Sequence, residues 1–83
     1  VKIKSLSSIG NHVNIKKESL VERSIIWNYV DIGNGCKIEN SIICNDCSIG
    51  DDCVIVDSIV APHCNISSNT TLKDRNIKLG EEI

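Results

Sequence analysis

The chain has 83 residues, a formal net charge of −2, 41% hydrophobic residues and only two aromatic side chains, Trp27 and Tyr29. This length allows one domain. Because acids and bases are interspersed, the basic stripe and aromatic platforms of a nucleic-acid-binding protein are missing, and we expect no nucleic-acid partner. No apolar run exceeds four residues, which argues against a membrane span, and the first residues lack a signal-peptide pattern.

The chain is organised by one 17-residue phrase. It is partial in residues 1–8, weak in residues 9–23 and clear in three abutting copies, SIIWNYVDIGNGCKIEN from Ser24, SIICNDCSIGDDCVIVD from Ser41 and SIVAPHCNISSNTTLKD from Ser58. A period this short, with one small structural unit per repeat, is typical of a solenoid.

Three aliphatic columns run through the repeats. The columns are Ile9, Ile26, Ile43, Val60 and Ile77; Ile15, Ile32, Ile49, Ile66 and Ile83; and Val21, Ile38, Ile55 and Leu72. Two residues before most members lies a small residue, such as Ser24 or Cys47, and positions i−2 and i share one face of a strand. The pattern therefore predicts an all-β parallel prism, with three short strands and three turns per coil and about four to five coils. In the partial coil, Lys4 stands where an aliphatic residue belongs, and we expect Ile3 to replace it.

Turn residues fall where the prism needs corners. Gly10, Gly33 and Gly50 follow inward residues directly, where the chain must bend and can need a positive φ. Asn40 and its equivalents Asp57 and Asp74 are expected at the corner of the shorter, five-residue step.

The last segment breaks the pattern, because Arg75 and Glu81 stand where earlier coils have small inward residues. Unpaired charges do not point into a dry core. We therefore expect one domain over residues 1–83, whose prism ends near Ile77 and whose polar residues 75–83 cap it. We also expect the chain to be a fragment of a longer one.

The outward positions predict an interaction surface. Flanking the first column is an apolar strip formed by Ile25, Trp27, Ile42, Cys44 and Ile59. A continuous patch of this kind is typical of a contact with another domain or subunit. The alternative is that isoleucine simply suits strands and the exposed face is tolerated.

The cysteines and histidines are better explained by the repeat than by chemistry. The inward cysteines share columns as small fillers, whereas Cys44 points outward, so the Cys44/Cys47 pair should diverge rather than bind one metal ion. His12 and His63 share one offset three coils apart, too far to cooperate. We expect no catalytic residue, metal site or cofactor, and the buried thiols favour a reducing, cytosolic location.

The Ile/Val-Gly hexads resemble those of hexapeptide-repeat proteins, which implies a left-handed parallel β-helix. The phrase from Ser24 to Asn45 is similar to the C-terminal β-helix of nucleotidyltransferase-like proteins, most of all to the gamma subunit of the guanine-nucleotide exchange factor for eukaryotic translation initiation factor 2, on the Ser-Ile-Ile-Cys-Asn and Gly-Cys-Lys-Ile motifs.

This resemblance implies a non-catalytic assembly or regulatory domain in translation initiation. Its implied partners are the epsilon subunit and, through the complex, the initiation factor. Three alternatives stay open: the epsilon subunit itself, whose β-helix also carries a Trp like Trp27; the C-terminal domain of a sugar-nucleotide pyrophosphorylase of the GDP-mannose type; and a hexapeptide acyltransferase, which would use a histidine between subunits.

Overall fold

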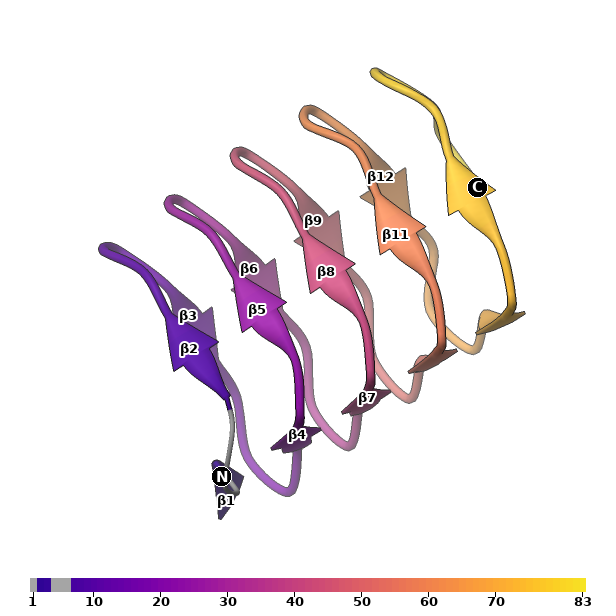
Figure 1. Cartoon of the computed structure of the whole chain (residues 1–83). Helices are drawn as coiled ribbons and strands as arrows, with labels where there is room; N and C mark the ends of the chain where they lie inside the picture. Colours follow the sequence, from indigo (N-terminus) through magenta and orange to yellow (C-terminus); the bar gives the residue numbers. More distant parts are fainter. Residues whose placement is uncertain (1, 4–6) are drawn as a thin grey trace.

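The molecule is an all-β prism of about four stacked coils, as the sequence predicts (Figure 1). The structure is a computed structural model that describes residues 2–3 and 7–83. Consecutive coils pair through parallel strands, with Ile26 opposite Ile43 and Ile43 opposite Val60. Partners 17 residues apart therefore stack directly, and the repeat length in the sequence is the circumference of one coil. No helix in the described residues could cross a membrane.

Three parallel sheets form the three walls of the prism. The first wall contains β2 (Ser8–Ile9), β5 (Ile25–Ile26), β8 (Ile42–Ile43), β11 (Ile59–Val60) and β14 (Asn76–Ile77). The second contains β3 (Asn14–Ile15), β6 (Asp31–Ile32), β9 (Ser48–Ile49) and β12 (Asn65–Ile66). The third contains β1 (Lys2–Ile3), β4 (Leu20–Glu22), β7 (Lys37–Glu39), β10 (Val54–Val56) and β13 (Thr71–Lys73).

The core is the interior of the prism, and the predicted columns fill it. The most buried apolar side chains are aliphatic or cysteine and come from all sides of the prism: Val21, Ile26, Val30, Ile32, Cys36, Ile38, Ile43, Cys47, Cys53, Ile55, Val60 and Cys64. Ile9 and Ile83, at the two ends of their columns, are each 36% exposed, because each has a neighbouring coil on one side only. Ile3 pairs with Val21 in the third wall, as expected, whereas Lys4 lies outside the described residues.

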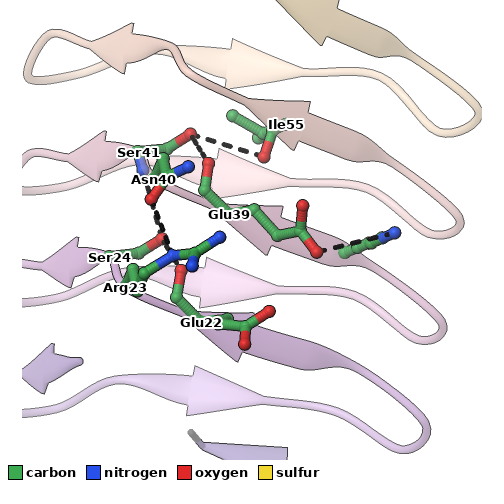
Figure 2. Close-up of polar contacts among 8 residues, drawn as sticks. Glu22, Arg23, Ser24, Glu39, Asn40, Ser41 and Ile55 are labelled. Carbon is green, nitrogen blue, oxygen red and sulfur yellow. Dashed lines mark hydrogen bonds and ion pairs between the residues drawn. The ribbon is translucent and has the colours of Figure 1, made fainter. Parts of the chain in front are cut away.

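A ladder of buried serines joins the coils beside the first wall (Figure 2). The N–H of Ser41 donates to Oγ of Ser24 at 3.2 Å, and the N–H of Ser58 donates to Oγ of Ser41 at 3.2 Å. Each hydroxyl also donates to a carbonyl two residues earlier in its own coil, as Ser41 does to Glu39 at 2.7 Å. The serines thus supply acceptors to buried backbone N–H groups that would otherwise be costly to leave unpaired.

The inward cysteines act as hydrogen-bond donors, whereas the serines act as acceptors. Their sequence pattern predicts only that they fill the core. Each thiol donates to a corner carbonyl of the following coil: Cys36 to Gly50 O at 3.0 Å, Cys47 to Ala61 O at 3.2 Å, Cys53 to Ser67 O at 3.1 Å and Cys64 to Lys78 O at 3.0 Å. The hydroxyl of Ser19 does the same for Gly33 O at 2.7 Å. The small inward residues therefore fill the core and also satisfy the backbone where the chain turns.

The prediction of a positive φ at Gly10, Gly33 and Gly50 is wrong, because the only glycines with positive φ are Gly35 and Gly80 among the described residues. Close approach explains these glycines instead. A Cβ at Gly33 would lie 2.7 Å from the carbonyl of Gly50 and would collide with the Asp51 carboxylate one coil away. That carboxylate accepts the N–H of Asn34 at 2.8 Å.

Left-handed residues occupy the three corners instead. Asn40, Asp57 and Asp74 have φ of 48°, 52° and 53°, so their predicted corner position is confirmed. Asn and Asp tolerate this conformation better than other non-glycine residues. His12, Tyr29, Asp46 and His63 form the second corner column, and Glu18, Gly35, Asp52 and Asn69 form the third.

The chain after Asp74 continues the winding. Strand β14 pairs with β11, and Glu82 forms a single bridge with Asn65. This segment lies on the preceding coil along the first and second walls, while the side chains of Arg75 and Glu81 are exposed.

Ile26 and Ile25 offer a matched test of this core, because they are adjacent on β5 and point to opposite sides of the first wall. Ile26 is 1% exposed and Ile25 is 44% exposed. Ile26→Ala should lower the free energy of unfolding by about 2–4 kcal/mol, and Ile25→Ala by less than about 1 kcal/mol, in urea titrations followed by circular dichroism. Equal losses from the two variants would contradict the assignment of inside and outside.

The serine ladder predicts a second pair of outcomes. Ser41→Ala removes the acceptor of the Ser58 N–H and should cost about 1–3 kcal/mol in the same titration. Ser48→Ala, on the exposed side of β9, should change stability by no more than about 0.5 kcal/mol. A Ser41→Ala variant as stable as the Ser48→Ala control would show that the ladder contributes nothing.

Candidate interaction surface

The predicted apolar strip exists as a stacked array on the outside of the first wall. Ile25, Ile42 and Ile59 lie opposite one another in consecutive strands. Ile25 is 44% exposed and Ile59 is 47% exposed, while Ile42 between them is half-buried. The structure therefore brings these side chains together in one row, as parallel pairing at a fixed repeat requires.

A second row beside the isoleucines contains Trp27 and Cys44. Trp27 is 49% exposed, and Cys44 in the next coil is half-buried. The N–H of Trp27 donates to Ile43 O at 2.9 Å and the N–H of Cys44 donates to Val60 O at 3.0 Å, so both backbones are fixed in the stack. We call Ile25, Trp27, Ile42, Cys44 and Ile59 together the apolar strip.

Polar residues bound the strip at both ends of the first wall. Ser8 pairs with Ile25 at one end, and Asn76 pairs with Ile59 at the other. Both are exposed. The apolar residues thus form a patch three coils tall rather than a feature of every coil.

The corner next to the strip carries residues that the sequence analysis did not include in it. The ring of Tyr29, which is 58% exposed, stacks on the ring of His12 with centroids 4.9 Å apart and planes 7° from parallel. One coil on from Tyr29, Asp46 lies 3.8 Å from His63, between Oδ2 and Nδ1. Tyr29 follows Trp27 by two residues along the chain, and its 17-residue offset from His12 was the signal that could have predicted the stacking of the two rings.

The other two walls differ from the first. The second exposes Asp31, Ser48 and Asn65, and Asn14 donates to the Asp31 carboxylate at 3.0 Å. The third presents the ion pair of Lys37 with Glu39 at 3.6 Å. Among the described residues, the exposed large apolar side chains outside the last coil lie on the first wall or at the corner next to it, and the last coil adds Leu79 and Ile83.

The two histidines do not form one site. His12 lies one coil before Tyr29 and His63 lies one coil after Asp46, so two coils lie between the two histidines. His12 stacks on Tyr29, and His63 pairs with Asp46. Both partner pairs lie at exposed positions on a corner. Within residues 2–3 and 7–83, no three His, Cys, Asp or Glu side chains gather to hold a metal ion.

An open hollow of about 560 Å³ lies at another corner, lined by Ile15, Lys16, Lys17, Glu18 and Asn34. It offers two amines, one carboxylate and one amide, with no thiol or imidazole among its lining residues. This set contains no pair of a nucleophile and a base.

The cysteines are all free thiols. Burial raises the pKa of Cys36, Cys44 and Cys47 above the ordinary value of 9.0. Desolvation disfavours the charged thiolate, which is the nucleophilic form. Cys47 lies in the core and Cys44 on the outer face, as expected from their offsets.

The stacked parallel coils and the 17-residue repeat define a hexapeptide-repeat β-helix of the sugar nucleotidyltransferase type. The model of the GMPPB C-terminal domain family matches residues 1–83, so the chain belongs to that family. The family supports the left-handed β-helix and the nucleotidyltransferase-like class that the resemblance implied. No curated protein matches the chain.

The raised thiol pKa values predict a loss of stability in alkali. Above 9.0 the unfolded chain releases protons that the folded chain retains at Cys36 and Cys47, so the free energy of unfolding falls as pH rises. Cys36→Ser/Cys47→Ser keeps a hydrogen-bond donor at both positions but removes both titrations. In urea titrations between about pH 7 and about pH 10, wild type should lose more stability than this variant. Parallel pH profiles would contradict the assignment.

Proposed function

We propose that this chain is the non-catalytic assembly domain of a sugar-nucleotide pyrophosphorylase-type protein of the GDP-mannose kind, and that its apolar strip binds a neighbouring domain or subunit. Membership of the GMPPB C-terminal domain family supports the protein class. The observation that carries the assembly role is the apolar strip on the first wall, with Trp27 49% exposed.

The composition of the strip favours a protein partner. It combines a large aromatic side chain with stacked aliphatic ones on a flat, rigid sheet, and it carries no charge. The cores of protein interfaces are depleted in charged residues and enriched in aromatic ones, and tryptophan is among the residues that contribute most when buried there. Because the backbone beneath is already fixed by the coil stack, little conformational entropy is lost when a partner binds.

The interior supports a non-catalytic role. Aliphatic and thiol side chains fill it, and the thiols donate to backbone carbonyls, which leaves them neither exposed nor activated. Any chemistry of the full-length protein would then take place in another domain, with this one holding it in position.

A second candidate is the gamma subunit of the translation initiation exchange factor, with the epsilon subunit as its partner. The motifs Ser-Ile-Ile-Cys-Asn from Ser41 and Gly-Cys-Lys-Ile from Gly35 favour it. Both candidates use the β-helix for assembly in the cytosol. The epsilon subunit and a hexapeptide acyltransferase, which would use a histidine between subunits, are weaker candidates.

The full-length protein distinguishes the two candidates. For the pyrophosphorylase type, we expect it to form GDP-mannose and pyrophosphate from GTP and mannose 1-phosphate. For the exchange-factor type, we expect no such synthesis, co-purification with the epsilon subunit, and faster GDP release from the initiation factor in that complex. GDP release without GDP-mannose synthesis would overturn the first proposal.

The assembly role has its own test. Trp27→Asp/Ile42→Asp in the full-length protein should weaken assembly by at least roughly tenfold in Kd, measured by sedimentation velocity, because charges replace the centre of the strip. Circular dichroism of the 83-residue domain should stay unchanged, since Trp27 is exposed and Ile42 is half-buried.

The matched control is Ser48→Asp/Asn65→Asp, which adds the same charge to the exposed second wall. It should assemble as wild type does. If both double variants assemble normally, the strip is not the interface.

A further inference from the structure

The last coil interrupts two of the inward columns with charged residues. Arg75 continues the column of Ser41 and Ser58, and its backbone N–H donates to Ser58 Oγ at 3.2 Å, as Ser58 itself donates to Ser41. Glu81 follows Cys64 by one repeat, and the bridge between Asn65 and Glu82 keeps that register. The backbone of the stack therefore continues through this coil, while charged side chains replace the small ones at these two positions.

Arg75 has no hydrogen-bond acceptor for a further coil at the position that serine occupies in the earlier coils. Each serine of the ladder accepts the N–H of the next coil at 3.2 Å. A guanidinium has five donors and no acceptor. The N–H of any coil placed on Arg75 would therefore lose its hydrogen bond and meet a positive charge.

Glu81 has no hydrogen-bond donor for a further coil at the position that cysteine occupies in the earlier coils. Cys47 and Cys64 each donate a thiol hydrogen to a carbonyl of the next coil, at 3.2 Å and 3.0 Å. An ionised carboxylate only accepts. Its Oε2 already accepts the N–H of Lys78 at 3.1 Å. The carbonyl of an added coil would therefore face a negative charge where the stack needs a donor.

Strand β13 (Thr71–Lys73) is the last strand of the third wall among the described residues, and Leu72 within it is only 2% exposed. Natural proteins protect the edges of sheets with charged residues, because strand edges can template further strands.

We propose that Arg75 and Glu81 close the C-terminal end of the prism to stacking by a second copy of this chain. The partner that they exclude is another hexapeptide coil, whose N–H and carbonyl groups would meet a cation and an anion in the wrong places. This inference concerns the end of the prism and is independent of the proposed function of its first wall.

The test puts small hydrogen-bonding residues back at the two positions. Arg75→Ser/Glu81→Ser supplies an acceptor and a donor at the two positions and leaves the net charge unchanged. The mass measured by sedimentation equilibrium should rise from the monomer value of 9.1 kDa towards that of a dimer or longer stack as protein concentration increases. Both proteins carry Trp27→Asp/Ile42→Asp, which prevents contact through the apolar strip, and the protein with Arg75 and Glu81 unchanged should stay at the monomer mass under the same conditions.

The matched control is Lys73→Ser/Glu82→Ser, which removes one cation and one anion from exposed outward positions of the same end. It should remain monomeric. A folded Arg75→Ser/Glu81→Ser variant that remains monomeric would overturn the proposal, as would control and ladder variants that associate equally.

Hydrogen exchange provides a second measurement that does not depend on those variants. If wild type already stacked through this end, amide protection in residues 71–83 would increase with protein concentration. We expect protection there to be independent of concentration, and an increase would also overturn the proposal. Because Arg75 and Glu81 are exposed, the single variants Arg75→Ser and Glu81→Ser should fold and can replace the double variant if needed.

Discussion

The structure depends on hydrogen bonds that each coil makes to the backbone of the next at its corners. Strand pairing satisfies the walls, but the turns leave N–H and carbonyl groups facing a narrow apolar interior. Serine hydroxyls accept the N–H of Ser41 and Ser58, and cysteine thiols donate to carbonyls such as Gly50 O. This requirement selects small inward residues that can form hydrogen bonds, and it fixes the repeat, because a slip of one residue would place them outside.

The sequence was sufficient to predict the walls and the columns, since a fixed period repeated over several coils leaves one consistent way to place Ile26, Ile43 and Val60. It was insufficient for the glycines. A sequence suggests φ at Gly33 from its neighbours along the chain, whereas the constraint comes from Asp51 in the next coil. The thiol hydrogen bonds were missed for the same reason, because the acceptors lie 14 residues away.

The candidate surface was predictable in position but less so in extent. Alternation along β5 and β8 is enough to place Ile25 and Ile42 outside. Tyr29 lies at a left-handed corner, where the alternation of a strand does not say which way the side chain points. The 17-residue offset from His12 places the two residues in consecutive coils, but the stacking of their rings needed the structure. The family match supports the nucleotidyltransferase type. Hexads alone separate the members of that class poorly, because the same physical constraint sets most of their residues.

The proposed apolar interface and the proposed closed end together imply that the prism binds partners at its side and not along its axis. Stacking along the axis would extend the sheets and continue the ladders of serine and cysteine, so it is the association that the repeat itself would favour. Arg75 and Glu81 oppose it at one end through mismatched hydrogen bonding, at exposed positions where the charges remain hydrated in the free chain. Contact through the first wall needs no ladder, only apolar area, and Trp27 with Ile25 and Ile59 provides it. A solenoid with one end closed and one wall apolar is therefore suited to binding partners at its side, where specificity depends on shape and not on a repeat common to many proteins.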